Sequence, residues 1–248
     1  MKISIITVVF NAKKTIRETI HSVLSQTYAN IEYIVIDGGS TDGTIEIVKN
    51  YGNKISKFVS EKDAGIYDAM NKGIALTTGD VIGFLNADDF YAGSSVIENI
   101  SAAFQRYEVD SVYADLEYVE QKKIENVVRF WKSSSYKKGA FKRGWHPAHP
   151  TFFVKKDIYS RYGSFNLSYK IAADYELMLR FLERYQISSH YLPYVLVKMR
   201  TGGESNKNVL NIIKANIESY QSWKDNGLPV NLFMFMLKPI SKVFQYFK

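Results

Sequence analysis

The sequence predicts an α/β fold in which a mixed, mainly parallel central sheet carries helices on both faces. Two observations support this prediction. Four short apolar runs between residues 3 and 89 alternate with segments whose apolar residues have helical spacing. The first run is apolar at consecutive positions, which is typical of a strand buried on both faces. The chain has 248 residues, 46% of them hydrophobic, so we expect one large core and a single domain.

The first half of the chain is expected to alternate strand and helix. We predict strands at residues 3–10, 31–37, 54–60 and 80–89, separated by helices at about 16–24, 45–48 and 64–77. The apolar start is interpreted as a buried strand, not a signal peptide, because it breaks at Asn11 without a small-residue cleavage site. Ligands of such sheets bind beyond the carboxyl ends of the strands. Asn11, Asp37, Asp63 and Asp88 follow these ends, so we expect them to gather at one edge.

The second half alternates less regularly. We predict strands at 111–119 and 126–131, an extended segment at 146–154, helices at 171–185 and 202–223, and a closing tail at 231–248. Pro147 and Pro150 disfavour helix in the extended segment. No apolar stretch reaches the roughly 18 residues that a membrane-spanning helix needs.

Composition restricts the class of partner. The formal net charge of +7 favours anionic partners, which include nucleic acid, phosphorylated small molecules and an acidic membrane surface. Lys and Arg are dispersed along the chain, which argues against nucleic acid. The absence of Cys excludes disulfides and thiolate metal sites, and it fits a reducing compartment.

Two adjacent acids, Asp88 and Asp89, end the fourth predicted strand. Neighbouring carboxylates repel each other, and burying either one is costly unless a cation or a set of donors compensates. One interpretation is a solvated turn that caps a helix starting near Ser94. The other is a Mg²⁺ or Mn²⁺ site completed by substrate phosphates, and the position at a strand end favours it.

Asp37 and Asp174 are further candidates. Asp37 opens a glycine-rich turn at the end of the second strand, where a carboxylate suits a nucleobase imide or a ribose hydroxyl; a simple helix cap is the alternative. Asp174 stands near the start of a predicted helix, where the helix dipole keeps a carboxylate ionised and fit to act as a general base. There too an N-cap is the alternative. His146 and His149 flank a proline-rich turn and are interpreted as structural, with substrate or phosphate contact as the alternative.

Six motifs in order, "TVVFN", "IVIDGGSTDGT", "EKDAGIYDAMNKGI", "GFLNADD", "HPTFF" and "IAADYELMLR", give the chain a family resemblance over roughly residues 1–203. They resemble the family 2 inverting glycosyltransferases with the GT-A fold, a Rossmann-like α/β domain. The resemblance is to the bacterial branch that builds O-antigen and capsule. It implies a nucleotide-sugar-binding half at 1–110, an acceptor-binding and catalytic half at 111–203, and a C-terminal helical extension at 204–248.

The resemblance also implies roles for individual residues. Asp174 would be the catalytic base, and Asp88 would bind the metal, Mn²⁺ or Mg²⁺. The implied donor-binding residues are Thr7, Val9, Asn11, Asp37, Asp63, Gly65, Asn86 and Asp89. Two positions depart from the family pattern. Asn86 replaces the first acid of the metal motif, and Met70 stands where many relatives have an Arg, which leaves Lys62 or Arg200 for a diphosphate contact.

The implied reaction transfers a hexose of the glucose or galactose type, with or without an N-acetyl group, from a UDP-sugar. The acceptor would be a hydroxyl of a lipid-diphosphate-linked oligosaccharide, and one in-line displacement would give a β-linkage. We expect a cytoplasmic protein bound peripherally to the inner face of the cytoplasmic membrane, with residues 231–248 either in the membrane interface or packed on the domain. A homodimer is compatible with the sequence. The alternatives are a sugar nucleotidyltransferase and a non-catalytic nucleotide-sugar or glycan-binding module.

Overall fold

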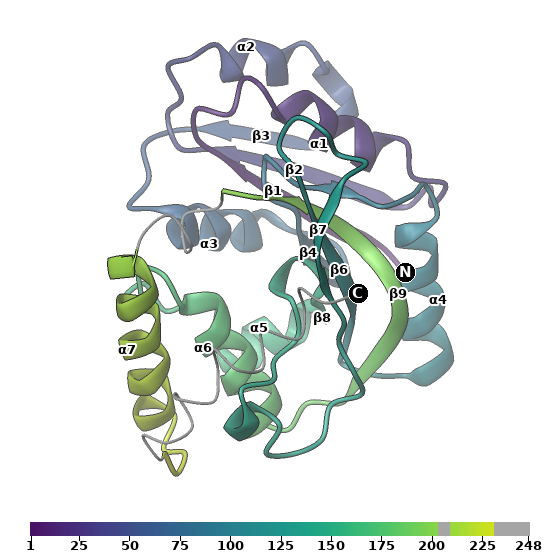
Figure 1. The fold of residues 1–248 in the computed structure, drawn as a ribbon. Helices are drawn as coiled ribbons and strands as arrows, with labels where there is room; N and C mark the ends of the chain where they lie inside the picture. Colours follow the sequence, from purple (N-terminus) through teal and green to yellow (C-terminus); the bar gives the residue numbers. More distant parts are fainter. Residues whose placement is uncertain (203–208, 231–248) are drawn as a thin grey trace.

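A mixed sheet runs through the whole molecule and separates two layers of helices (Figure 1). The structure, a computed structural model, describes residues 1–202 and 209–230. Within them the strand order is β3-β2-β1-β4-β8-β6-β9-β5, and β7 pairs with β6. The two longest ladders, β1 with β2 and β6 with β9, are parallel. The predicted α/β class with a mixed, mainly parallel sheet is confirmed.

The elements have the following bounds. The strands are β1 (Ile3–Val9), β2 (Ile31–Asp37), β3 (Lys57–Ser60), β4 (Val81–Phe84), β5 (Phe90–Tyr91), β6 (Ser111–Val119), β7 (Val127–Trp131), β8 (Phe153–Lys155) and β9 (Ser189–Arg200). The α-helices are α1 (Ile16–Leu24), α2 (Thr44–Lys49), α3 (Ile66–Leu76), α4 (Val96–Tyr107), α5 (Lys156–Tyr162), α6 (Ala173–Leu179) and α7 (Val209–Asp225). Short 3-10 helices occupy Gly52–Lys54, Phe141–Arg143 and His149–Thr151.

The first half of the fold follows the predicted alternation. Every residue of β1 is buried, because each face of this strand meets a separate apolar core. Ile3, Ile5 and Val9 pack with α1, α2 and α4, whereas Ile6 and Val8 pack with α3, α5 and α6. Strands β3, β2, β1 and β4 are all parallel, so their carboxyl ends share one edge of the sheet.

The second half contains one long strand that the sequence pattern does not reveal. β9 runs parallel to β6, and its register shifts where Ala114 is opposite Leu192 but Asp115 is opposite Val195. The shift leaves Pro193 and Tyr194 in a bulge. Proline cannot donate to a sheet ladder, so the bulge lets the strand continue past it.

The predicted helix at 171–185 consists of an α-helix followed by a π-helix. α6 is followed by a π-helix at Arg180–Arg184, in which the Tyr185 N–H donates to the Arg180 carbonyl over 3.0 Å. The predicted helix at 202–223 corresponds to α7, which packs beside α6 (Figure 1). The tail at 231–248 lies outside the described residues. No helix in the part of the chain that the structure describes is long and apolar enough to cross a membrane.

Candidate active site

Asp37 organises the loop that follows β2. One carboxylate oxygen, Oδ2, accepts hydrogen bonds from the Gly39 N–H (3.0 Å), the Ser40 N–H (3.0 Å) and the Ser60 hydroxyl (2.7 Å). The side chain is fully buried, and within residues 1–202 and 209–230 the other oxygen, Oδ1, has no hydrogen-bond partner. Buried acceptors are rarely left unpaired in proteins. Asp37 therefore caps a loop and not a helix, and its Oδ1 is an acceptor available to a ligand.

Asn11 binds the same loop from the end of β1. Its side-chain Oδ1 accepts from the Thr41 N–H (2.9 Å), and its own N–H donates to the Ser40 hydroxyl (2.8 Å). Asn11 has a φ of 49°, a left-handed conformation that asparagine tolerates better than most residues. The carboxyl ends of β1 and β2 are thus joined by side-chain contacts, as predicted for this edge.

Asp63 and Gly65 form the adjoining turn before α3. A Cβ atom on Gly38 would lie 2.4 Å from Asp63 Oδ2, so this carboxylate lies directly against the Asp37 loop. The Gly65 N–H donates to Asp63 Oδ1 over 2.9 Å. Gly65 has φ 122° and ψ 175°, a combination that is essentially restricted to glycine. The structure therefore brings Asn11, Asp37 and Asp63 together.

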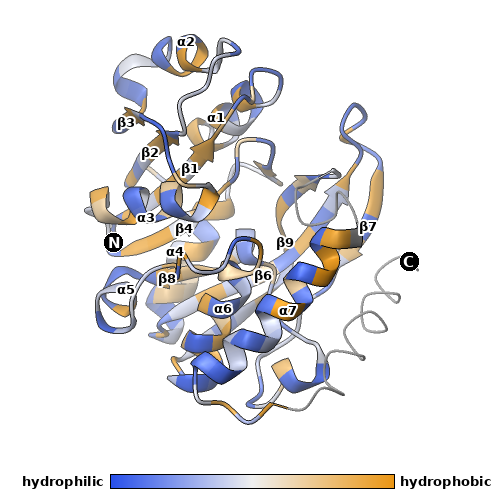
Figure 2. Ribbon diagram, turned by 90° about the vertical axis from the view of Figure 1, so that its left-hand side faces the viewer, coloured by the Kyte–Doolittle hydropathy of each residue, from blue (hydrophilic) through white to orange (hydrophobic). Residues whose placement is uncertain are grey.

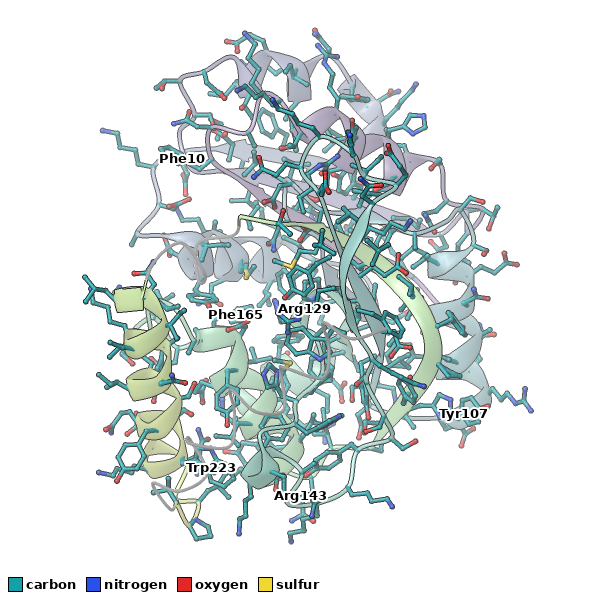
Figure 3. The ribbon with its side chains drawn as sticks, in the orientation of Figure 1. Phe10, Tyr107, Arg129, Arg143, Phe165 and Trp223 are labelled. Carbon is teal, nitrogen blue, oxygen red and sulfur yellow. The ribbon has the colours of Figure 1, made fainter. Side chains whose placement is uncertain are left out.

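Thr7 lies within β1, whereas Val9 is its last residue and is paired with Asp37 of β2. Thr7 is fully buried, and its hydroxyl accepts a hydrogen bond from the Tyr33 hydroxyl over 3.1 Å. Val9 packs into the apolar core. Direct contact of either side chain with a nucleotide stays a prediction. Phe10, which follows Val9, is 65% exposed and projects at the outer edge of the molecule (Figure 3).

The turn after β4 holds Asn86, Asp88 and Asp89. Asp89 is fully buried, and burial followed by the charge of Asp88 raises its pKa well above the ordinary value. Asp88 is half-buried, and burial raises its pKa as well. Asn86 Nδ2 donates to Asp89 Oδ2 over 3.3 Å. In the described part of the chain, Asn86 Oδ1 and Asp89 Oδ1 are buried without a partner.

The alternative in which these acids cap a helix does not apply. α4 begins after Ser95, and no side chain caps it. The acids are instead attached to β9, because the Arg200 guanidinium donates to the Asp88 carbonyl over 2.5 Å. The same guanidinium pairs with Glu18 of α1 and lies 4.9 Å from the centre of the Phe90 ring. Arg200 is 4% exposed, so it fixes the turn and is committed to these partners. Lys62, the other candidate for a diphosphate contact, is exposed.

Asp174 is the second residue of α6, and Ala172 occupies the N-cap position. Its Oδ1 accepts from the Tyr175 N–H (2.8 Å) and lies 3.1 Å from the Tyr67 hydroxyl. The Tyr67 hydroxyl is also 2.7 Å from the Ile171 carbonyl oxygen. Asp174 is therefore a half-buried carboxylate tied to the first turn of α3, directly after the Asp63 turn.

Aromatic rings connect Asp174 with the end of β4. His149 stacks on Phe84 with ring centres 5.5 Å apart, and Phe165 contacts both rings. Phe165 also stacks on Tyr67 at 5.5 Å, between α3 and α6 (Figure 3). Burial lowers the pKa of His149, and the charge of Asp174 opposes this shift. His149 is thus a buried ring packed between Phe84 and Phe165, which agrees with its structural interpretation.

The arrangement suits a cation beside Asp88. Arg200 binds the Asp88 carbonyl instead of the carboxylate, so the half-buried acid keeps a raised pKa that a cation would lower. In the described parts of the chain, no group of three acidic or histidine side chains gathers in one place. A divalent ion would therefore take Asp88 as a protein ligand and obtain most of its ligands from phosphate oxygens or water, as Mg²⁺ usually does.

Sequence reasoning missed two residues of this site and only suggested a third. Tyr67 lies within a quoted motif, but its partners Ile171 and Asp174 are more than 100 positions away. Glu18 lies in an amphipathic helix, where an acidic residue is normally interpreted only as part of the solvent-exposed face. Arg200 was a candidate for phosphate binding, whereas the structure gives it a role in holding the Asp88 turn.

Four parallel strands that end at one edge, with acids at or after the ends of β2, β3 and β4, are features of a GT-A-type glycosyltransferase domain. Residues 4–162 match the sequence model described as "Glycosyl transferase family 2". The chain belongs to this family, and it is a glycosyltransferase. A "PGL/p-HBAD biosynthesis glycosyltransferase" of Mycobacterium bovis is 27% identical over 216 residues, which cover 82% of this chain and 78% of the relative.

Solved structures show the same fold at low identity. S. aureus TarS 1-349 in complex with UDP-GlcNAc gives a TM-score of 0.72 at 17% identity, covering 96% of this chain and 70% of that one. The chain spans 44% of a longer TarS chain. The mannosyltransferase PcManGT from Pyrobaculum calidifontis, in complex with GDP-Man and Mn²⁺, gives 0.67 at 19% identity and covers 99% of this chain and 69% of that one.

Proposed function

We propose that this glycosyltransferase moves a hexose from a UDP-sugar to a hydroxyl of a lipid-diphosphate-linked oligosaccharide, with inversion to a β-linkage. The product would belong to a bacterial surface polysaccharide of the O-antigen or capsule type. One observation carries the proposal. Asp174 is hydrogen-bonded to Tyr67 of α3, the helix that follows the Asp63 turn, and the Tyr67 ring stacks on Phe165, which contacts Phe84 at the end of β4.

The donor side is supported by unsatisfied acceptors and by loop geometry. Asp37 Oδ1 is buried and unpartnered among the described residues, which suits an N–H of a nucleobase or a ribose hydroxyl. Asn11, Asp63 and Gly65 shape the loops around it. The net positive charge favours a diphosphate. TarS binds UDP-GlcNAc and PcManGT binds GDP-Man, so a nucleotide-sugar donor agrees with the neighbours, and uridine is our proposal for this chain.

Asp174 is the proposed general base. The acceptor hydroxyl must lose its proton as its oxygen attacks the anomeric carbon, and a carboxylate on the acceptor side can take that proton. Both contacts of Asp174 fall on Oδ1, and among the described residues none reaches Oδ2. Oδ2 is therefore the oxygen that we assign to the proton. Because attack occurs on the face opposite the leaving diphosphate, an α-linked donor gives a β-linked product.

Mn²⁺ or Mg²⁺ is the proposed cofactor. Asp88 would hold the ion, with Asn86 and Asp89 shaping the turn around it. When bound, such an ion supplies positive charge that stabilises the departing nucleoside diphosphate. The raised pKa of Asp88 and the absence of a basic partner on its carboxylate in the described chain support this assignment.

The acceptor and location proposals rest on exposed apolar residues of the C-terminal extension. Leu210, Ile213 and Ile217 of α7 are 67%, 50% and 61% exposed, and Figure 2 shows hydrophobic residues at one end of this helix. Such a surface suits the inner face of the cytoplasmic membrane, where a lipid-linked acceptor is held. Residues 231–248 add Phe, Met, Leu and Lys in sequence, although they lie outside the described part of the structure.

An Asp174→Asn variant tests the reaction. Asparagine keeps the shape of the side chain and cannot take a proton, so we expect transfer to fall by about 100-fold or more while UDP affinity stays within about twofold. Donor preference is first found by following UDP release from a panel of nucleotide sugars with Mn²⁺ present. Transfer at the wild-type rate by Asp174→Asn would remove Asp174 from the mechanism. A wild-type chain that binds UDP-sugars without consuming them would favour the non-catalytic binding module.

A second experiment tests the metal. Chelation is expected to abolish transfer, and Asp88→Ala is expected to weaken UDP binding in the presence of Mn²⁺ by about tenfold. The comparison with UDP binding in the absence of Mn²⁺ isolates the contribution of the ion. Equal UDP affinity with and without Mn²⁺ in the wild-type chain would argue against this site.

A further inference from the structure

Glu218 of α7 binds a run of backbone amides on another element. Its Oε1 accepts from the Lys170 N–H (3.0 Å), and its Oε2 accepts from the Ile171 N–H (2.8 Å) and the Ala172 N–H (2.8 Å). Hydrogen bonds from amides to a charged acceptor are stronger than those between neutral groups. A half-buried carboxylate from the C-terminal extension thus fixes three consecutive peptide groups.

These peptide groups lead directly into α6. The N-cap of α6 is Ala172, which has no side-chain acceptor, so the N-cap position provides no side-chain cap. A helix start without a cap is less stable and frays more easily. Glu218 accepts from the three N–H groups that immediately precede the helix, so it does not cap α6 but fixes the backbone from which the helix starts.

The clamped segment is connected to the proposed base by two short steps. The Ile171 carbonyl accepts from the Tyr67 hydroxyl at 2.7 Å, and the same hydroxyl is 3.1 Å from Asp174 Oδ1. Asp174 itself is the second residue after Ala172. Any rotation of the peptide between Ile171 and Ala172 would therefore move the carbonyl that positions Tyr67 and the turn that carries Asp174.

We propose that Glu218 is a positioning residue for sugar transfer, because it holds the Lys170–Ala172 backbone and through it the orientation of Asp174. This inference rests on the proposed function, since it assigns Glu218 a role through the proposed base. Displacing a reacting group by about 1 Å can cost about 100-fold in rate. The C-terminal helix is then a part of the acceptor-side machinery, although it lies beyond the segment 4–162 that matches the family model.

α7 has other contacts with α6 that provide a matched control. The Asn226 amide, just beyond α7, donates to Glu176 Oε1 over 3.0 Å, and Trp223 Nε1 donates to the Tyr175 hydroxyl over 3.0 Å. Asn226→Ala weakens the attachment of α7 without touching the Lys170–Ala172 amides. It therefore separates a loss of α7 packing from a loss of the clamp.

The test compares full-length wild type, Glu218→Ala, Glu218→Gln and Asn226→Ala. Backbone hydrogen exchange is followed in peptides that cover 170–172, and kcat, the donor KM and UDP affinity are measured with the preferred donor. We expect Glu218→Ala to raise exchange at these amides at least tenfold and to lower kcat by about 10- to 100-fold, with donor KM and UDP affinity within about twofold. Glu218→Gln keeps one acceptor oxygen and should give intermediate values for exchange and kcat.

The outcomes separate the two levels of the proposal. Faster exchange in Glu218→Ala with wild-type kcat would show that the clamp exists but does not position the base, and would overturn the inference. An equal fall in kcat for Asn226→Ala and Glu218→Ala would overturn it too, because general loosening of α7 would explain both. If Glu218→Ala fails to fold, the same comparisons are made with Glu218→Gln. A wild-type chain without transferase activity for any donor would instead refute the proposed function, while the exchange data would still report on the clamp.

Discussion

Replacing Tyr67 by Phe removes one oxygen atom from the centre of the proposed site. The hydroxyl carries one hydrogen, and two acceptors compete for it: the Ile171 carbonyl at 2.7 Å and Asp174 Oδ1 at 3.1 Å. Tyr67 is 9% exposed, so water does not readily replace the missing group. The ring stacks on Phe165, and phenylalanine keeps that contact. The variant therefore tests the hydroxyl and leaves the packing almost unchanged.

The expected effect follows from the two contacts. The hydroxyl orients Asp174, and displacing a reacting group by about 1 Å can cost about 100-fold in rate, so we expect kcat to fall by about 10- to 100-fold. The bond to the Ile171 carbonyl contributes about 0.5–1.5 kcal/mol to folding. For a domain of this size, 1 kcal/mol corresponds to about 2–4 °C in Tm. We expect a large fall in kcat, a fall in Tm of a few degrees, and an unchanged donor KM.

The assay measures transfer from the preferred UDP-sugar under saturating donor, with Tm recorded by thermal unfolding. Tyr136→Phe is the matched control, because its hydroxyl donates to one backbone carbonyl, that of Leu182, over 3.0 Å. Its loss should lower Tm to a similar degree and leave kcat near the wild-type value. If Tyr67→Phe and Tyr136→Phe have the same kcat, the hydroxyl of Tyr67 does not support the base, and the reasoning from its two contacts is refuted.

Four further perturbations have defined outcomes. Arg200→Lys cannot hold both Glu18 and the Asp88 carbonyl, so it should lower Tm and weaken Mn²⁺-dependent UDP binding about tenfold; full affinity would exclude Arg200 from this role. Burial lowers the pKa of His149 below its ordinary 6.5, so the unfolded chain binds more protons there and stability falls as pH drops below about 6.5. A His149→Phe variant should therefore gain Tm relative to wild type between pH 7.5 and 5.5, and a constant difference would contradict this. Burial raises the pKa of Asp89, so its ionised form destabilises the folded chain near neutral pH. Asp89→Asn should therefore raise Tm at pH 7.5 and give little gain near pH 4, which thermal unfolding at these two pH values would show. Gly65→Ala places a side chain at φ 122° and should cost about 1–3 kcal/mol in the free energy of unfolding by urea; an unchanged value would indicate that the turn relaxes.

The sequence pattern predicted the first half of the fold because its signals are local. The apolar run at residues 3–10 and the helical spacing that follows it specify β1 and α1 without reference to other segments. The gathering of Asn11, Asp37 and Asp63 follows from parallel strands sharing an edge, which is a property of the topology. The contacts of Asn11 and Asp63 with the Asp37 loop agree with it.

The second half of the fold was predicted less well because its structure depends on distant partners. β9 contains Pro193, which locally disfavours a strand, and only pairing with β6 around a bulge makes the strand stable. The sequence placed Asp174 near a helix start, but neither Tyr67 nor Glu218 carries a local sign of its role. Tyr67 is 107 positions from its partner Asp174, and Glu218 is 46 to 48 positions from the amides that it binds. No short-range pattern encodes such pairs.

The residues of the proposed site and those that hold them in place are unevenly distributed along the chain. The segment 4–162 that matches the family model includes Asp37, Asp63 and Asp88. Asp174, Arg200 and Glu218 all come later, and each contacts an element other than its own. β9 cannot be separated from β6, because the two strands form the longest ladder of the sheet. A change after residue 162 can therefore act on either side of the proposed site: through Glu218 it reaches Asp174, the proposed base, and through Arg200 it reaches the Asp88 turn. A change that moves Tyr67 will likewise be felt at Asp174.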